Sequence, residues 1–196
     1  MSGWLTLSEL ESMGFASLGE NVFLSKKCSV YGAERIHLGS NVRIDDYCAL
    51  SAGEGCIHIG DYVHFSTHVT IAGAGKVTIS DFSGVSSKTS IFSSSDDYLG
   101  RGMSNPMVPD KYKFVKHDEV FLGKHTLIGA NSVILPGANL PEGCSVGALS
   151  MVSNRLEAWS VYLGNPAKKV VKRSKNLLKL EQQFYDDLNS AANDET

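Results

Sequence analysis

The sequence lacks the features that mark several common classes of protein. Its four cysteines (Cys28, Cys48, Cys56 and Cys144) show no C-x-x-C spacing, which argues against a structural zinc site. No apolar run approaches the roughly 18 residues that a membrane span needs, and the N-terminal residues lack the basic and apolar regions of a signal peptide. Because 18 Lys and Arg stand against 21 Asp and Glu, nothing indicates a nucleic-acid partner. We therefore expect a cytoplasmic protein with reduced thiols and no membrane span.

Charged side chains are also scarce, whereas glycine is abundant. Charged residues form 20% of the 196 residues, against about 25% in a typical domain. The 19 glycines exceed the roughly 14 expected at an average usage of about 7%. A chain of this length most simply forms one domain, and its composition favours strands and turns.

An apolar residue recurs every six positions in blocks of three, and only Phe65 among the eighteen is not aliphatic. A small or β-branched residue follows four positions later in the first two hexads of each block, and glycine often follows the apolar residue directly. The blocks are Leu18, Leu24, Val30; Leu38, Ile44, Leu50; Ile59, Phe65, Ile71; Ile79, Val85, Ile91; Leu122, Ile128, Ile134; and Leu140, Val146, Val152.

A period of six fits neither an amphipathic helix nor a simple hairpin meander. It predicts a coil of three short strands, in which each strand points one apolar side chain inward and glycine supplies the permissive backbone of a corner. Stacked coils would pair their backbones and bury the apolar columns. Since the repeat is interrupted between Ile79 and Leu122, we expect residues 93–119 to leave the prism as one long loop. The predicted fold class is all-β, a parallel β-helix of hexapeptide repeats.

Helical patterns flank the repeat. Residues 1–16 form an N-terminal segment with one short helix predicted at 6–13. The β-helix takes residues 17–165. Residues 166–196 are predicted to form a C-terminal helix that opens at Pro166, followed by a frayed tail from residue 189. The apolar stripe of this helix is Leu177, Leu180, Phe184 and Leu188.

The hexad blocks, together with the closing sequence GALSMVSNRLEAWSVYLGNPAKKV, resemble the hexapeptide-repeat acyltransferases over about residues 17–173. The ending GNPAK (Gly164–Lys168) is similar to the branch that contains the galactoside and maltose acetyltransferases. The stretches NVRIDDYCALS, IFSSSDDYLGRGMSNPMVP and GALSMV most resemble enzymes that N-acetylate dTDP-4-amino-4,6-dideoxyglucose for the O-antigen of lipopolysaccharide.

This resemblance implies a left-handed β-helix, acetyl-CoA as the co-substrate, a nucleotide-linked amino sugar as the acceptor, and no metal. It also implies a homotrimer with active sites between neighbouring prisms. An isolated prism would expose flat faces and a long loop, which agrees with a trimer. By the same resemblance, Ala130 and Ala148 would meet the pantetheine arm of CoA. The basic residues after the prism would bind its phosphates, and the candidates are Lys168, Lys169 and Arg173.

Acetyl transfer needs a base, a donor that stabilises the oxyanion, and a cleft for CoA. In the galactoside-acetyltransferase branch the catalytic histidine lies in the long loop. Here the loop offers Asp96 and Asp97 instead, and no histidine precedes His117. His68 falls where, by this resemblance, sugar acetyltransferases of the branch carry a substrate-contacting asparagine, and we favour it as the base, with Asp96 or Asp97 orienting it or binding the sugar. His125, at the corresponding outward position of the fifth coil, is the next candidate.

The remaining polar residues receive weaker assignments. His117 and His64 are minor candidates for the base, and we place His37 and His58 in corner insertions with a structural or solvent-exposed role. Residues of the long loop that would contact the sugar are Ser94, Ser95, Tyr98 and Asn105.

Two kinds of alternative stay open. If the acceptor is an amine, its neutral fraction is already nucleophilic, and a carboxylate or the departing thiolate could take the proton. The loop has aspartate where that branch has histidine, and this difference therefore favours N- over O-acetylation. O-acetylation of a polysaccharide sugar or its precursor is the first alternative. The second alternative is a non-catalytic β-helix, or a metal-dependent one in which His64, His68 and His125 converge on zinc across a subunit interface.

Overall fold

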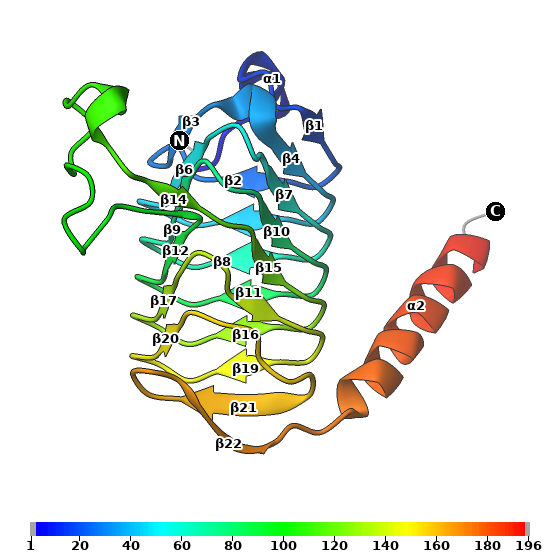
Figure 1. The fold of residues 1–196 in the computed structure, drawn as a ribbon. Helices are drawn as coiled ribbons and strands as arrows, with labels where there is room; N and C mark the ends of the chain where they lie inside the picture. The colour runs from blue at the N-terminus through cyan, green and yellow to red at the C-terminus, as the bar shows by residue number, and fades with distance from the viewer. Residues whose placement is uncertain (1–2, 195–196) are drawn as a thin grey trace.

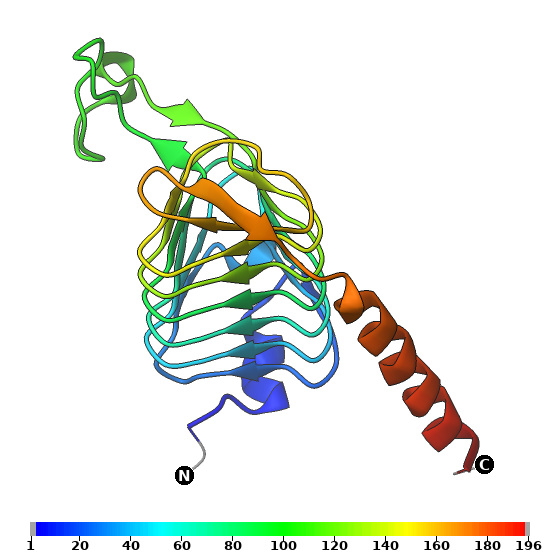
Figure 2. The ribbon, with the colours of Figure 1, turned by 90° about the horizontal axis from the view of Figure 1, so that it is seen from below.

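The computed structural model describes residues 3–194 as a stack of triangular coils that forms a prism (Figure 1). A short helix, α1 (Leu7–Ser12), covers the N-terminal end, and Thr6 caps it by accepting a hydrogen bond from the Glu9 backbone. A long loop leaves the prism on one side, and helix α2 (Asn176–Asp194) leaves it on the other, as both views show (Figures 1 and 2). The predicted all-β parallel β-helix with two flanking helices is confirmed.

Three parallel sheets form the faces of the prism. Sheet 1 contains β1 (Ser17–Leu18), β4 (Ile36–Leu38), β7 (Ile57–Ile59), β10 (Val77–Ile79), β15 (Val120–Leu122) and β18 (Asn139–Leu140). Sheet 2 contains β2 (Phe23–Leu24), β5 (Arg43–Ile44), β8 (His64–Phe65), β11 (Gly84–Val85), β16 (Leu127–Ile128), β19 (Ser145–Val146), β21 (Ser160–Leu163) and the antiparallel β22 (Lys168–Lys172). Sheet 3 contains β3 (Ser29–Tyr31), β6 (Ala49–Ala52), β9 (Thr70–Gly73), β12 (Ser90–Phe92), β17 (Val133–Ile134) and β20 (Met151–Val152).

The strand register confirms the predicted columns. Leu38 pairs with Ile59, Ile44 with Phe65, and Leu50 with Ile71, so that equivalent hexad positions lie directly above one another. Sixteen of the eighteen positions are buried, and Leu18 and Val30 in the first coil are half-buried. One continuous apolar core therefore runs through the prism.

The corners turn in a way that the sequence analysis did not predict. None of the glycines that follow the inward residues has a positive φ. The left-handed corner conformation belongs instead to residues such as Tyr47 (φ 62°) and His68 (φ 63°). The glycines serve close approach between coils, because a Cβ on Gly39 would lie 2.6 Å from the carbonyl carbon of Gly60. The prediction that these glycines supply the permissive backbone of the corners is thus wrong. Glycine is needed at these positions because neighbouring coils pack closely there.

A ladder of side chains crosses the corner between sheets 1 and 2. The backbone N–H of Ser40 donates to Asp61 Oδ1 at 2.7 Å, and the N–H of Asp61 donates to Asp81 Oδ1 at 2.9 Å. Each carboxylate therefore satisfies a backbone donor of the coil above. The missing Cβ of Gly60 leaves room for this arrangement, because a Cβ there would overlap the Asp81 carboxylate.

The C-terminal segment differs from the prediction. Residues 168–172 form β22, which pairs antiparallel with β21, and α2 begins only at Asn176 rather than at Pro166. The helix continues to Asp194, so the frayed tail expected from residue 189 is also wrong as far as residue 194, and residues 195–196 lie outside the described range. Between residues 3 and 194, no helix is both long and apolar enough to cross a membrane.

Candidate active site

The long loop is anchored to the prism by a two-stranded antiparallel ribbon. Strand β13 (Ser94–Ser95) pairs with β14 (Lys116–His117). The hydroxyl of Ser94 accepts a hydrogen bond from the backbone N–H of Ala74 at 2.7 Å and lies 2.7 Å from Nδ1 of His117. Ser94 and His117 therefore fix the direction in which the loop leaves, and His117 is engaged in that role.

The two loop carboxylates have different environments. Asp97 accepts hydrogen bonds from Nε and Nη2 of Arg101 at 3.1 and 2.9 Å, and from the backbone N–H groups of Arg101 and Gly102. Its side chain is only 1% exposed. Desolvation pushes the pKa of Asp97 upward, but the hydrogen bonds from Arg101 outweigh it and hold the pKa below its usual range. Asp96 is exposed, so of these two adjacent carboxylates it is the one that can reach a ligand.

The predicted sugar-contacting residues of the loop are only partly brought together. Ser95, Asp96 and Tyr98 line one cavity of about 480 Å³ with Arg101 and Phe114. Asn105 instead stabilises a turn, because its Oδ1 accepts the backbone N–H of Met107 at 2.9 Å.

His68 lies at the corner between β8 and β9 with its side chain exposed. Its ring packs against Tyr47 at a centroid distance of 4.9 Å. Within residues 3–194, no side chain forms a hydrogen bond with its imidazole, so nothing in one chain selects its tautomer. His68 is therefore free to contact a ligand, but the carboxylate partner that we expected from the loop is not bonded to it.

His125 does not occupy the corner that His68 occupies. It lies between β15 and β16, at the corner of sheets 1 and 2, and is 7% exposed beneath α2. Its Nε2 is 2.7 Å from Oε2 of Glu181, whose other oxygen binds Lys124. Burial pushes the pKa of Glu181 upward, but the bonds from Lys124 and His125 hold it below its usual range. We therefore no longer assign His125 as a candidate base, because its side chain helps to dock α2.

A second cavity of about 330 Å³ lies on the outer face of sheet 2, lined by side chains that include His64, Ser86, Ser87 and the predicted CoA contact Ala130. His64 Nε2 lies 2.9 Å from Asp45 Oδ2, and Arg43 Nε donates to Asp45 Oδ1 at 2.8 Å. Desolvation raises the pKa of Asp45, but the bonds from His64 and Arg43 outweigh it and lower the pKa overall. The sequence analysis missed this pairing, because His64 and Asp45 come together only through the stacking of coils.

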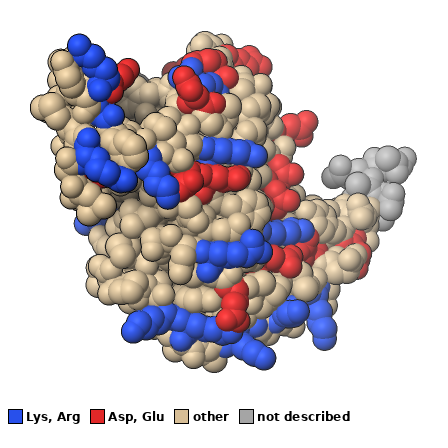
Figure 3. All heavy atoms as spheres, viewed as in Figure 1, with Lys and Arg blue, Asp and Glu red and all other residues tan. Residues whose placement is uncertain are grey.

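Basic side chains gather around the last coils of the prism (Figure 3). Lys168 is exposed on β22, and Lys169 Nζ lies 2.5 Å from Glu157 Oε2. Lys169, Lys172 and Arg173 line a cavity of about 280 Å³ next to Trp159. Arg173 Nη1 donates to the backbone carbonyls of His125 and Gly143 at 2.6 and 3.2 Å. This arginine is thus engaged in holding the end of the prism, whereas the lysines remain accessible.

The two alanines predicted to contact CoA differ in how accessible they are. The carbonyl of Ala130 accepts the N–H of Leu149 at 2.9 Å, and Ala148 is exposed. Ala148 therefore presents an accessible position beside the cavity that Ala130 lines.

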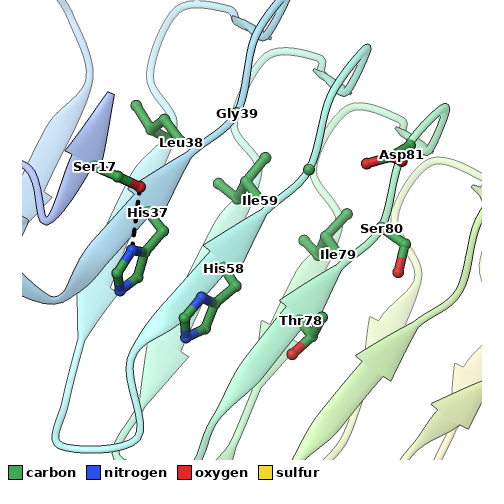
Figure 4. A pocket seen from close by; sticks show the side chains of 11 residues that line it. Ser17, His37, Leu38, Gly39, His58, Ile59, Thr78, Ile79, Ser80 and Asp81 are labelled. Carbon is green, nitrogen blue, oxygen red and sulfur yellow. Dashed lines mark hydrogen bonds between the residues drawn. The ribbon is translucent and has the colours of Figure 1, made fainter. Parts of the chain in front are cut away.

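The outer face of sheet 1 carries a groove of about 400 Å³ that the sequence analysis did not predict (Figure 4). His37 and His58 lie in β4 and β7, not in corner insertions. Our placement of these two histidines was wrong, because the coil-to-coil insertions lie before β4 and β7 and shift both histidines into strands.

Within one chain, the structure does not bring His64, His68 and His125 together. His68 and His125 lie at different corners, and each of His64 and His125 binds a carboxylate. Over the described part of the chain, no group of three or more His, Cys, Asp or Glu side chains could hold a metal ion.

Comparison with known proteins identifies the family. No family model matches the chain. The dTDP-4-amino-4,6-dideoxy-D-glucose acyltransferase of Escherichia coli is 51% identical over 176 residues, which cover 90% of this chain and 92% of that protein.

Solved structures of similar proteins point to the same family of acyltransferases. AntD, an N-acyltransferase from Bacillus cereus, solved with dTDP and 3-hydroxybutyryl-CoA, superposes with a TM-score of 0.92 at 38% identity, covering 96% of this chain and all of that one. An AntD variant was solved with dTDP-4-amino-4,6-dideoxyglucose and coenzyme A. A maltose O-acetyltransferase from Clostridium difficile, at 17% identity and a TM-score of 0.56, covers 86% of this chain and 74% of that one, and shares the fold alone. The chain therefore belongs to the hexapeptide-repeat acyltransferases, in the branch of the dTDP-4-amino-4,6-dideoxyglucose acyltransferases.

Proposed function

We propose that this enzyme transfers an acetyl group from acetyl-CoA to the 4-amino group of dTDP-4-amino-4,6-dideoxyglucose. The identity of 51% over nine-tenths of the chain to an acyltransferase of that name carries the proposal. In the reaction, the amine nitrogen attacks the thioester carbonyl, the carbon–sulfur bond breaks, and CoA leaves. One proton of the amine passes to a base or to the departing sulfur.

Asp96 is the group that we propose to receive this proton. Asp97 is tied to Arg101, His64 to Asp45, His117 to Ser94 and His125 to Glu181. These pairings leave Asp96 and His68 as the two exposed candidates. Since the neutral amine is already a good nucleophile, a weakly basic carboxylate is sufficient, and His68 becomes the second candidate.

Solved variants of AntD are compatible with either aspartate of the loop. They replace one serine and one aspartate that lie ten positions apart. Ser86 and Asp96 have this spacing here, as do Ser87 and Asp97. Both serines line the cavity on sheet 2, but only Asp96 is unrestrained among the two aspartates.

We further propose that CoA lies along the last coils, with Lys168 and Lys169 near its phosphates, and that the enzyme works as a cytoplasmic homotrimer in the synthesis of O-antigen. The loop supports assembly, because Tyr98 and Met107 are 91% and 88% exposed. Large apolar side chains at such exposure are typical of an interface. A neighbouring prism would cover them and would bring a second chain to the loop cavity.

The proposal is tested with purified protein, acetyl-CoA and dTDP-4-amino-4,6-dideoxyglucose. Release of free thiol should depend on the amino sugar, and mass spectrometry should show one added acetyl group. The matched acceptor is the same dTDP-sugar with a 4-hydroxyl group. Faster thiol release with the hydroxyl sugar would establish O-acetylation instead, and no acceleration by either sugar would refute the proposal.

Loop variants separate the candidate residues. Asp96→Asn should lower kcat by about 10²–10⁴, the usual contribution of a general base. Asp110→Asn is the matched control, since Asp110 lies in the same loop but pairs with Lys113 at the surface. If His68→Gln shows the large loss and Asp96→Asn does not, His68 is the base.

A further inference from the structure

One lysine on the first four coils of the prism has no carboxylate beside it. Lys88 lies at the corner between β11 and β12, with an exposed side chain and a φ of 60°. The other Lys and Arg side chains of these coils each lie within 4.0 Å of a carboxylate oxygen, and they are Lys26, Lys27, Arg35, Arg43 and Lys76. Over residues 3–92, Lys88 is therefore the one such cation that is left for an external anion.

His68 stands at the equivalent corner of the preceding coil. The strands that follow the two corners pair in register, Thr70 with Ser90. His68 and Lys88 each precede that pair by two residues, and the backbone N–H of Lys88 donates to the carbonyl of Thr67 at 3.0 Å. Since neighbouring strands lie about 4.7–4.9 Å apart, one ligand can contact both exposed side chains.

This corner borders the cavity on the outer face of sheet 2. Ser66, Ser86 and Ser87 line that cavity, and they precede His68 and Lys88 in their coils by one or two residues. The hydroxyls of Ser66 and Ser87 lie 2.8 Å apart, so they connect the two coils. A cation, an imidazole and hydroxyl groups therefore meet at the rim of one cavity.

A carboxylate close to this corner is already neutralised. Asp46 Oδ2 accepts a hydrogen bond from Lys27 Nζ at 2.7 Å, and its Oδ1 accepts one from the Ser25 hydroxyl. The bond from Lys27, followed by that from Ser25 and the nearby charges of Lys27 and His68, holds the pKa of Asp46 below its usual range. An anion at the corner would thus meet a carboxylate whose charge Lys27 balances.

The position of the corner along the prism indicates which anion it takes. This step rests on the proposed function, in which CoA lies along the last coils and its thioester meets the sugar amine. Ala130 in the fifth coil and Ser86 in the fourth line the same cavity. If CoA extends from there towards the C-terminal end, the acceptor extends towards the earlier coils, where Lys88 and His68 lie.

We propose that Lys88, together with His68, binds the diphosphate of the nucleotide-sugar acceptor. The ammonium group forms charge-assisted hydrogen bonds with phosphate oxygens, and an imidazole N–H adds a second donor one coil away. The two side chains would hold the nucleotide at the rim while the sugar enters the cavity. They are binding residues in this assignment, and proton transfer stays with Asp96.

The experiment titrates the wild-type protein and its variants with dTDP by calorimetry. Lys88→Gln should weaken dTDP binding at least about tenfold, because a charge-assisted bond to phosphate is lost. His68→Gln should weaken it about three- to tenfold. Lys88→Arg keeps the charge and should stay within about threefold of the wild type. Lys76→Gln is the matched control, since Lys76 is exposed at another corner, between β9 and β10, and it should leave the affinity unchanged.

A titration with CoA distinguishes the two substrates, because CoA also carries a diphosphate. Lys88→Gln should leave the affinity for CoA unchanged. If this variant weakens CoA binding and leaves dTDP binding unaltered, the corner belongs to CoA and the inference is overturned.

Turnover separates this inference from the proposed function. With dTDP-4-amino-4,6-dideoxyglucose, Lys88→Gln should raise the KM for the sugar about tenfold while kcat changes by less than about threefold. If wild-type thiol release depends on the amino sugar but Lys88→Gln alters neither this KM nor the dTDP affinity, this inference alone is wrong. If thiol release does not depend on the amino sugar, the proposed function fails, and the dTDP titration still decides the role of Lys88.

Discussion

Replacing Gly60 with alanine tests the role assigned to the corner glycines. A Cβ at this position would overlap Asp81 Oδ1 and lie 2.9 Å from the Asp81 backbone nitrogen. The carboxylate must therefore move and give up its hydrogen bond from the Asp61 N–H, which measures 2.9 Å. Leaving a backbone donor without its partner costs about 1–3 kcal/mol, so we expect Gly60→Ala to lower the free energy of unfolding by about 2 kcal/mol.

A double-mutant cycle isolates the cause. Asp81→Ala alone should cost about 1–2 kcal/mol through loss of the same hydrogen bond. With the carboxylate already removed, the new methyl group at residue 60 meets less obstruction. The loss of unfolding free energy in the double variant should therefore be smaller than the sum of the two single losses by at least about 0.5 kcal/mol.

The assay is urea unfolding followed by circular dichroism at one fixed protein concentration, because assembly would make the stability depend on concentration. For a chain of this length, each kcal/mol also lowers Tm by about 2–4 °C. If Gly60→Ala is as stable as the wild type, or if the two losses add to within about 0.3 kcal/mol, close approach between coils is not the reason for glycine at this corner.

Three further predictions follow from the site and the core. Glu181→Gln should loosen the docking of α2 and speed proteolysis of this helix. In the wild type the pKa of Glu181 is lowered. The docking should therefore be intact above the ordinary glutamate pKa of about 4.3 and be lost as the pH falls through the lowered value. Intact docking well below that pH would contradict the role of Glu181. Lys169→Met should raise the KM for acetyl-CoA several-fold while kcat changes little, and an unchanged KM would remove Lys169 from the CoA site. Ile71→Ala, in a fully buried column, should lower the free energy of unfolding by about 2–5 kcal/mol, and a loss below about 1 kcal/mol would contradict tight packing of the core.

The architecture was largely predictable because its signal is periodic. Each hexad places one apolar side chain inward, so Leu24, Ile44 and Phe65 could be assigned to one column before their pairing was known. The corner conformation was not predictable in this way. Residues as different as Tyr47 and His68 adopt the same positive φ there, because stacking of neighbouring coils, and not the local residue type, selects that conformation.

Candidate site residues were harder to assign, because their roles depend on partners far away in the chain. The partner of His125 is Glu181, on a helix that follows the whole prism. His64 acquires Asp45 only when the second and third coils stack. Asp96 and Asp97 are adjacent in sequence, yet one is exposed and the other is held by Arg101. Only the folded loop distinguishes them.

The final strand has a consequence for the behaviour of the protein in solution. A stack of parallel coils ends in an open row of backbone donors and acceptors, which is a template for end-to-end growth into fibres. Here β22 reverses direction and covers β21, so the last ladder is antiparallel and the next coil of another molecule would meet the wrong polarity. Three lysines along β22, Lys168, Lys169 and Lys172, add charge to the same edge. Lys168 and Lys169, proposed to lie near the CoA phosphates, would thus also disfavour pairing with another molecule at this edge of sheet 2.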